Sequence, residues 1–385
     1  MNKIILALLL TTSLAASANA QNCVNPSRCA ELGYRDDVGK CSGRKTLLCP
    51  FDSNKAFCID PDGGSGFYTC DDFLEAIKEV DGVIYLSRGL ECDMTGKSTS
   101  IRFAEGLKVI GTADQPKIEF INVGENKPTL TLPGRNTFEN LRIVNADISV
   151  SGNDKFINIQ AENISGTNPN NLTFEGNISA NDINIQQGTF NTQNLSFNDL
   201  SCKHTNQNNT ENLQIGCTAE GTLSGKLISG VELNTGNIHQ TIQIYASIIN
   251  KDLSLPDTNI SHSIINANIS KAKKVEYCYV SNASIVRLQT VGSGGAVVSY
   301  IHLSKDAKYF SKNPGNWSTS TFVYSATLES GATVWTHSLG EAAMYNGIWR
   351  AHKNISETTT IRNDSISEYF TRIGDWDGTI PDDIN

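Results

Sequence analysis

A short motif of an asparagine, an isoleucine and a serine recurs through the middle of this chain. Between about Val83 and Leu288, short apolar or β-branched runs alternate with an Asn or a Gly. This repetition predicts a solenoid of short β-strands, because alternate residues of a strand face opposite sides and each repeat can bury one side. The near copies and looser variants are Asn163-Ile164-Ser165, Asn177-Ile178-Ser179, Asn259-Ile260-Ser261, Asn268-Ile269-Ser270, Asp182-Ile183-Asn184-Ile185 and Asn194-Leu195-Ser196-Phe197.

Residues 1–20 have the pattern of a secretory signal peptide. Lys3 precedes an apolar run from Ile4 to Leu10, and Ala18-Asn19-Ala20 supplies the small residues of a cleavage site. The run is shorter than the roughly 20 residues that a membrane-spanning helix needs, and no later segment approaches that length. We therefore expect a bacterial protein that is secreted, periplasmic or at the cell surface, with no transmembrane segment after signal cleavage.

The charge of the chain argues against one class of partner. Its formal net charge is −9 at neutral pH. A surface that binds nucleic acid or anionic lipid needs clustered Lys and Arg to neutralise phosphates. We expect no nucleic-acid partner.

All ten cysteines follow the expected cleavage site, and six of them lie between Cys23 and Cys70. In an exported protein this usage predicts disulfides. Zinc is the alternative, but these six are spaced too widely for a zinc knuckle and have no His among them. Six cysteines allow 15 pairings, so the connectivity stays open. The candidates for disulfide bonds are Cys23, Cys29, Cys41, Cys49, Cys58, Cys70, Cys202 and Cys217. Cys202 and Cys217 bracket a polar stretch, Lys203 to Gly216, and we expect these two to be bonded to each other.

Residues 21–66 form a small cysteine-rich module, too poor in apolar residues to fold on a core alone. Its elements Leu32-Gly33-Tyr34, Cys49-Pro50-Phe51-Asp52 and Phe57-Cys58 resemble cysteine-rich segments that follow the signal peptide in some bacterial exported proteins of unassigned function. The resemblance implies no activity. The Asp, Pro and Gly residues from Asp60 to Gly66 predict a turn and linker.

A short amphipathic helix is expected over residues 70–80. Thr69 fits the N-cap, and Phe73, Leu74, Ile77 and Val80 form one apolar stripe. Because a solenoid must cover its first open repeat, we expect this helix to be a cap. Strands are expected directly after it, at residues 83–86, 100–103 and 107–111.

The order of these elements resembles the start of right-handed parallel β-helices of the pectin-lyase-like class. The resemblance spans roughly residues 70–290 and rests on residues 83–86, 107–111 and 136–143, the last reading Asn-Thr-Phe-Glu-Asn-Leu-Arg-Ile. It implies the fold and a distant link to carbohydrates. Proteins of this class include enzymes, adhesins and passive scaffolds, so the fold does not settle the function.

We assign residues 67–290 to the parallel β-helix, and 291–385 to further rungs or a C-terminal cap. The C-terminal part contains all four tryptophans. Residues 333–336 and 357–362 in it have strand character.

Catalytic residues are not evident in the middle of the chain. Polysaccharide-cleaving β-helices need a pair of carboxylates, or acidic calcium ligands and a base beside a uronate. Between Asp93 and Glu276 no two acidic residues are closer than five apart, and no arginine lies between Val144 and Val286. The six histidines have no HxH or HExxH spacing. We identify no catalytic residue and favour a protein that is not an enzyme.

Stacked repeats could still bring distant carboxylates together. A rung of such a helix takes roughly 20 residues, so positions one rung apart become neighbours. Glu211, Glu232 and Asp252 have this spacing and could bind calcium if they aligned on one face. The alternative is three separate solvated carboxylates on turns. We expect no cofactor, with calcium as the open alternative.

Asn-x-Ser/Thr triplets recur in the chain, among them those that begin at Asn163, Asn177, Asn259, Asn268 and Asn354. They could accept glycans in a eukaryotic secretory path. Because the signal peptide looks bacterial and the triplets recur with the repeat, we expect their side chains to make hydrogen bonds within turns.

The sequence therefore predicts an all-β, right-handed parallel β-helix with a short N-terminal capping helix and a small disulfide-rich N-terminal module. We expect a non-catalytic surface or envelope-associated protein that binds a glycan or a surface protein along its side. The alternative is a carbohydrate-active enzyme, a polysaccharide lyase or hydrolase, of the pectin-lyase-like class.

Overall fold

The computed structural model describes residues 46–51, 54–59, 70–78, 83–86, 89–111, 113–166, 171–281, 284–288, 297–298, 301–304, 306–310, 322–328, 333–336, 338–344, 348–352 and 371–376. The predicted signal peptide, Cys23, Cys29, Cys41, Asn354 and the strand expected at 357–362 lie outside these residues. The chain forms two compact units, Met1–Asn181 and Asp182–Asn385. In the described parts of both units, almost all regular elements are β-strands that pair in parallel.

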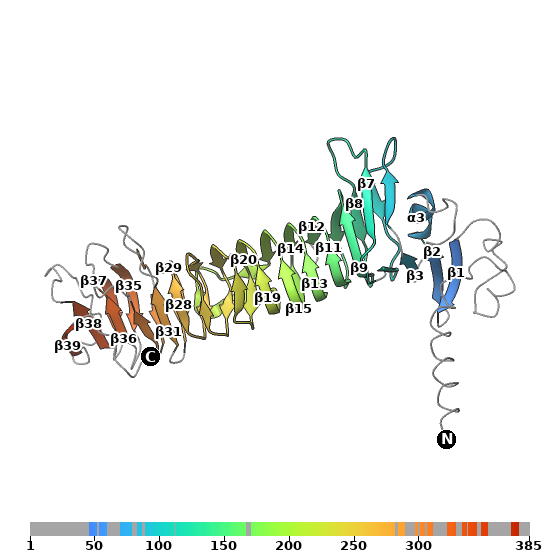
Figure 1. The fold of residues 1–385 in the computed structure, drawn as a ribbon. Coiled ribbons are helices and arrows are strands. Elements are labelled where there is room, and N and C mark those ends of the chain that lie inside the picture. The colour runs from blue at the N-terminus through green and yellow to red at the C-terminus, as the bar shows by residue number, and fades with distance from the viewer. Residues whose placement is uncertain are drawn as a thin grey trace, which may run out of the picture. The chain divides into compact units, whose positions relative to one another are not determined.

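The first unit consists of parallel strands stacked one repeat apart (Figure 1). One stack contains β5 (Ser100–Arg102), β8 (Thr129–Leu132), β10 (Asp147–Val150) and β12 (Asn163–Gly166). The other contains β3 (Val83–Leu86), β4 (Leu90–Asp93), β6 (Lys108–Gly111), β7 (Lys117–Ile121), β9 (Thr137–Val144), β11 (Lys155–Gln160) and β13 (Asn171–Ser179). An antiparallel hairpin of β1 (Thr46–Phe51) and β2 (Asn54–Ile59) precedes them, and β2 pairs in parallel with β3.

A column of phenylalanine rings forms the core of the first unit. Phe138, Phe156 and Phe174 occupy the same position in the successive strands β9, β11 and β13, and Phe103 follows β5. Each of the four rings is at most 2% exposed. Their ring centroids are 5.3, 6.0 and 5.1 Å apart along the column. The apolar residue of each strand thus packs on its counterpart in the next repeat, as the alternating sequence pattern predicts.

The expected helix is α3 (Cys70–Ala76), and it packs on this column. Phe73 and Ile77 are 0% and 1% exposed, and the Phe73 ring meets Phe103 edge-on at 6.2 Å. A disulfide joins Cys70 to Cys92 of β4. Cys70 is therefore in a disulfide, as expected, and its partner lies outside the group of six cysteines, because β4 runs beside the first turn of α3 and brings the two Cα atoms to 4.6 Å from each other.

Asparagines fix the bend within the long strands β9, β11 and β13. Asn140 and Asn158 have φ of 53° and 52°, a left-handed conformation that asparagine tolerates better than most residues. The Asn158 amide donates to Asn140 Oδ1 at 2.9 Å, and Asn158 Oδ1 accepts the backbone N–H of Asn177 at 2.9 Å. The third repeat has Gly176 at the bend with φ of 72°, where a Cβ would lie 2.1 Å from Asn158 Oδ1. Only glycine fits there.

The second unit has three stacks of parallel strands. The first contains β14 (Asp182–Ile185), β16 (Asp199–Cys202), β20 (Leu227–Ser229), β23 (Gln243–Tyr245), β26 (Asn259–Ser261) and β29 (Lys274–Glu276). The second contains β15 (Gln187–Ser196), β19 (Cys217–Ser224), β21 (Val231–Leu233), β22 (Asn237–His239), β24 (Ile248–Ile249), β27 (Ile264–Ile265), β30 (Tyr279–Val280), β32 (Val297–Val298), β33 (Ile301–Leu303), β35 (Phe322–Leu328) and β37 (Ser338–Met344). The third contains β25 (Leu253–Ser254), β28 (Ile269–Ala272), β31 (Ile285–Leu288), β34 (Lys308–Phe310), β36 (Thr333–Thr336), β38 (Ile348–His352) and β39 (Thr371–Trp376).

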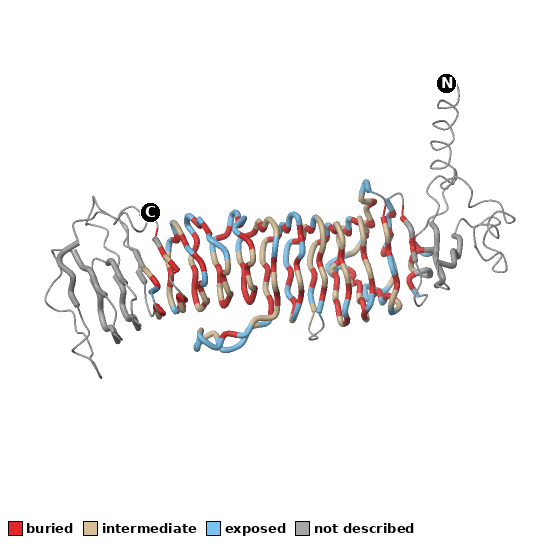
Figure 2. The backbone as a smooth tube through the Cα atoms, turned by 90° about the horizontal axis from the view of Figure 1, so that it is seen from below, coloured by how far each residue is buried: buried red, intermediate tan, exposed pale blue. Residues whose placement is uncertain are grey.

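From β23 to β31, each repeat of the second unit passes through the three stacks in turn and then returns to the first. From β23 the chain continues to β24 and β25, and β26 then pairs in parallel with β23. Ile228, Ile244, Ile260 and Val275 lie in register on adjacent strands and are all 0% exposed. Figure 2 shows the resulting alternation of buried and more exposed residues along the strands. The arrangement is consistent with a parallel β-helix.

Candidate functional site: a row of aromatic side chains

One corner of the second unit turns through a left-handed residue in four successive repeats. Gly230, Ala246, His262 and Tyr277 occupy this corner, with φ of 69°, 45°, 53° and 53°. The side chains at this position differ in exposure: Ala246 is 0% exposed, His262 is half-buried and Tyr277 is 39% exposed. The corner therefore leaves the larger aromatic side chains accessible in the last two of these repeats.

Serine hydroxyl groups stacked inside the corner hold it in place. Ser247 and Ser263 are both 0% exposed. Ser247 Oγ accepts the backbone N–H of Val231 at 3.3 Å, and Ser263 Oγ accepts that of Ser247 at 3.1 Å. Each hydroxyl also donates to a carbonyl two residues earlier, at 2.8 Å for both. Since each repeat hydrogen-bonds the next, the corners stay in register.

Four aromatic side chains gather beside this corner, and we call them the aromatic row: His204, Tyr245, His262 and Tyr277. The centroid distances along the row are 5.3, 5.1 and 4.7 Å. The first two contacts are T-shaped and tilted, whereas His262 and Tyr277 are stacked with an interplanar angle of 20°. The spacing follows the distance of about 4.8 Å between neighbouring strands of a sheet.

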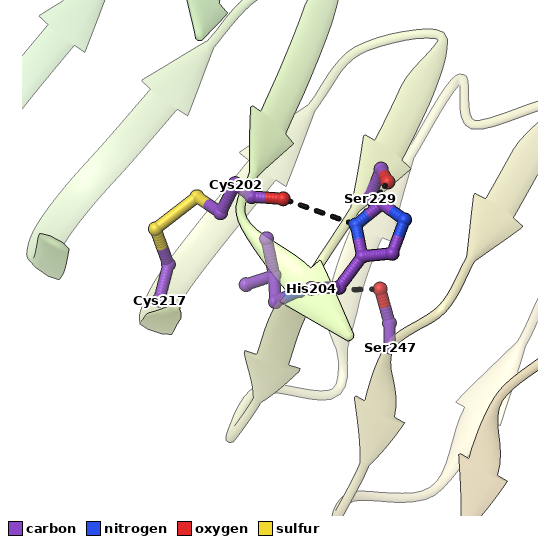
Figure 3. Close-up of a disulfide and its surroundings, with 6 residues drawn as sticks. Cys202, His204, Cys217, Ser229 and Ser247 are labelled. Carbon is purple, nitrogen blue, oxygen red and sulfur yellow. Dashed lines mark hydrogen bonds between the residues drawn. A yellow bond between two sulfur atoms is a disulfide. The ribbon is translucent and has the colours of Figure 1, made fainter. Parts of the chain in front are cut away.

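The row is accessible and carries polar atoms at its edge. Tyr277 is 39% exposed, and the other three side chains are half-buried. His204 Nδ1 lies 3.1 Å from the Cys202 carbonyl and 3.5 Å from Ser229 Oγ (Figure 3). The phenol and imidazole groups can therefore make hydrogen bonds while their rings offer apolar surface.

Charge is balanced along the row. Burial lowers the pKa of His262, which keeps its imidazole neutral at neutral pH. Its Nδ1 is buried and has no hydrogen-bond partner. At the end of the row, Glu276 forms an ion pair with Lys274 at 2.6 Å. The surface therefore suits a neutral ligand better than an ionic one.

An arm that projects from the repeats begins next to His204. It comprises residues 203–216, with β17 (His204–Thr205), the 3-10 turn Thr210–Asn212 and β18 (Gln214–Ile215), and β17 pairs antiparallel with β18. The disulfide expected between Cys202 and Cys217 is present at its base (Figure 3). Closing a loop of this length contributes roughly 3 kcal/mol in the chain-entropy account.

The three carboxylates proposed for calcium are not brought together. Glu211 lies at the tip of the arm and pairs with His302 Nδ1 at 2.5 Å. Glu232 accepts the amide of Asn250 at 2.7 Å, and Asp252 accepts the side-chain amide of Asn268 at 3.1 Å. Among the residues that the structure describes, no group of three His, Cys, Asp or Glu could hold a metal ion.

The physical reason is the length of the repeat. Here Ser247 and Ser263, which are 16 residues apart, are equivalent. Residues about 20 apart therefore fall four positions out of step, on different faces. The hypothesis of stacked carboxylates assumed a longer rung than this chain has.

Asparagines of the recurrent triplets make hydrogen bonds between repeats. The Asn163 amide donates to Asp147 Oδ1 at 2.8 Å, and the Asn268 backbone N–H donates to Asp252 Oδ1 at 2.8 Å. The isoleucine after each of them is 1% exposed. The asparagines therefore link neighbouring repeats by hydrogen bonds, and the isoleucines fill the interior. Such structural roles are what the recurrence of the motif predicts.

One further cysteine, Cys278, is free and buried. Burial raises its pKa to about 12, so the thiol stays protonated at neutral pH and is a poor nucleophile or metal ligand. It occupies the corner position of Ser247 and Ser263 and donates to the Glu276 carbonyl at 3.2 Å. We assign it a packing role.

Sequence reasoning missed the aromatic row. The histidines look scattered when they are read along the chain, because the row combines strand, corner and arm residues. The usable signal is the alignment of Ile228-Ser229-Gly230, Ile244-Tyr245-Ala246, Ile260-Ser261-His262 and Val275-Glu276-Tyr277, which places a residue of the row in three of the four segments.

In the described parts of the chain, no helix is long and apolar enough to span a membrane. No protein-family model, curated protein or solved structure matches the chain.

Proposed function

We propose that the protein is a secreted or cell-surface, non-catalytic right-handed parallel β-helix that binds a neutral glycan along the aromatic row. The observation that carries this proposal is the row itself, with ring centroids 4.7 to 5.3 Å apart and Tyr277 39% exposed. The parallel stacked strands and the two disulfides support an exported protein of this fold. The resemblance to the pectin-lyase-like class supports a carbohydrate ligand.

The chemistry of the row supports a sugar rather than an apolar ligand. A pyranose has C–H groups that pack on aromatic surface and hydroxyl groups that need hydrogen-bond partners. The row offers both, through its rings and through the Tyr hydroxyl and His nitrogen atoms. The ion pair of Lys274 and Glu276 leaves no net charge at its end, which favours a neutral sugar over an acidic one.

The arrangement does not favour hydrolysis. Glycoside hydrolysis needs two carboxyl groups on either side of the bond to be cleaved. Among the described residues of the row and the strands that carry it, Glu276 is the carboxylate beside the rings, and it is paired with Lys274. Binding is therefore the activity that the site supports.

The proposal is tested by titrating the protein with cellotetraose, a neutral and flat glycan. The double substitution Tyr245→Ala and Tyr277→Ala should weaken binding about tenfold or more, because two aromatic contacts are lost. Isothermal titration calorimetry measures the effect. The sugar should be recovered uncleaved.

The matched control is Tyr279→Ala. Tyr279 lies in the same repeat as Tyr277 but faces a different side, where its ring meets His302 at 4.8 Å. Its loss should leave binding unchanged. If both variants bound cellotetraose equally weakly, or if the wild-type protein did not bind it, the aromatic row would not be the glycan-binding site. New reducing ends that a point mutation abolishes would support the carbohydrate-active enzyme instead.

A further inference from the structure

A pocket lies at the base of the arm, apart from the aromatic row. Its volume is about 170 Å³, and its polar lining consists of Gln186, Gln187, Lys203, Thr205 and Gln214. Lys203 and Thr205 flank His204 in the sequence, so the pocket and the row lie on opposite sides of β17, because alternate residues of a strand face opposite ways. The pocket can therefore act independently of the row.

The pocket is preformed by the backbone around it. Gly216 lines it, and a Cβ on this residue would lie 2.0 Å from the Gln186 carbonyl oxygen. The glycine therefore lets the arm lie directly on the preceding repeat. The next residue, Cys217, is tied to Cys202 by the disulfide at the other side of the arm's base. When the side chains and loops of a site are already ordered, binding costs less conformational entropy and the affinity is higher.

The lining of the pocket is positively charged at one residue and otherwise neutral. Lys203 is the one charged residue among those that line the pocket, and no carboxylate lies among them. The side chain of Lys203 is exposed, and none of the hydrogen bonds and ion pairs of the described residues occupies its ammonium group. Three glutamine amides add N–H donors around it, and Gln214 Oε1 is engaged by the Thr205 hydroxyl at 3.3 Å. A cation ringed by neutral donors favours a small anion with several acceptor oxygens.

We propose that this pocket binds a small carboxylate-bearing ligand, with Lys203 as the counter-ion and the glutamine amides as hydrogen-bond donors. The volume limits the ligand to a small organic anion, since a molecule of liquid water takes about 30 Å³. The proposal does not depend on glycan binding by the aromatic row.

The test uses a matched pair of probes, D-gluconate and D-sorbitol, which differ in a carboxylate in place of a hydroxymethyl group. Gluconate should bind at least about tenfold more tightly, because a hydrogen bond to a charged group is worth more than a neutral one. Lys203→Met should reduce gluconate binding to the level of sorbitol. Lys226→Met, another exposed lysine of the same unit, is the control and should bind gluconate like the wild type.

Ligand-observed NMR titration measures the affinities, and thermal unfolding shows that each variant is folded. Acetate as a third probe separates recognition of the carboxylate alone from recognition of the whole ligand, and it should compete with gluconate. Equal affinity for gluconate and sorbitol, or gluconate binding that survives Lys203→Met, would overturn the proposal. Loss of cellotetraose binding in the Tyr245 and Tyr277 variant with intact gluconate binding would show that the two sites are separate.

Discussion

Replacing Phe73 and Ile77 together by Asp is expected to lower the free energy of unfolding by roughly 3 to 6 kcal/mol, since each buried apolar side chain contributes about 1.5 to 3 kcal/mol. Both side chains are almost fully buried, and Phe73 covers the ring of Phe103 at the N-terminal end of the phenylalanine column. The substitution would also place carboxylates against apolar surface. Chemical denaturation followed by circular dichroism measures the loss.

The control for this prediction is Leu74→Asp on the same helix. Leu74 is half-buried, so its replacement should cost much less. The disulfide between Cys70 and Cys92 keeps the helix attached in all variants, and the loss therefore reports packing. An unchanged melting temperature of the double variant would show that α3 does not cover the column.

Acidification from about pH 7 to about pH 4 is expected to stabilise the wild-type protein relative to Asp154→Asn by up to roughly 3 kcal/mol. Asp154 is 2% exposed, its Oδ1 accepts the Asn136 backbone N–H at 2.9 Å, and its Oδ2 is buried without a partner. Burial raises the pKa of Asp154 from 3.8 to about 6. The folded state therefore holds this proton more tightly than the unfolded chain.

Protonation of Asp154 therefore favours the folded state at low pH. The contribution of Asp154 is fully present below its unfolded pKa of 3.8 and is lost as the pH rises through about 6. Asparagine cannot titrate, so the difference in unfolding free energy between the two proteins should change over this window. A constant difference across the window would contradict the burial of an ionisable carboxylate at this site.

Asp93→Asn is the control with the opposite sign. The Thr95 backbone N–H, the Thr95 hydroxyl and the Asn122 amide hold the pKa of Asp93 at about 2. Its contribution is present above 3.8 and is lost only as the pH falls through about 2. The difference between wild type and this variant should therefore stay flat between about pH 4 and pH 7.

The repeats and their interior are predictable from the sequence because they depend on local alternation. Ile164, Ile178 and Ile260, each at the centre of an Asn-Ile-Ser motif, are at most 2% exposed. The strand expected at 83–86 is β3, with the same limits, and the strand expected at 333–336 is β36. The alternation of apolar and polar residues predicts a strand without information about the strands with which it pairs.

The aromatic row depends on the register between repeats, and local pattern does not give it. His204 comes from the arm, Tyr245 from a strand and His262 from a left-handed corner, so no fixed spacing relates them. The corner itself is hidden in the sequence, because Ala246 and Tyr277 have φ of 45° and 53° although neither is a usual residue for that conformation. At the Ala246 corner, the backbone N–H of Ser247 donates to the Ser263 hydroxyl oxygen of the next repeat and so stabilises this conformation.

The most direct test of glycan binding along the row is the affinity of the wild-type protein for cello-oligosaccharides of increasing length. The row contains four rings at intervals of 4.7 to 5.3 Å, so successive sugars of an extended chain can contact successive repeats. Calorimetric titration should show affinity that rises with each added sugar up to about four and then levels off. Affinity that does not change with length, or that rises equally in the Tyr245 and Tyr277 variant, would contradict binding along the row.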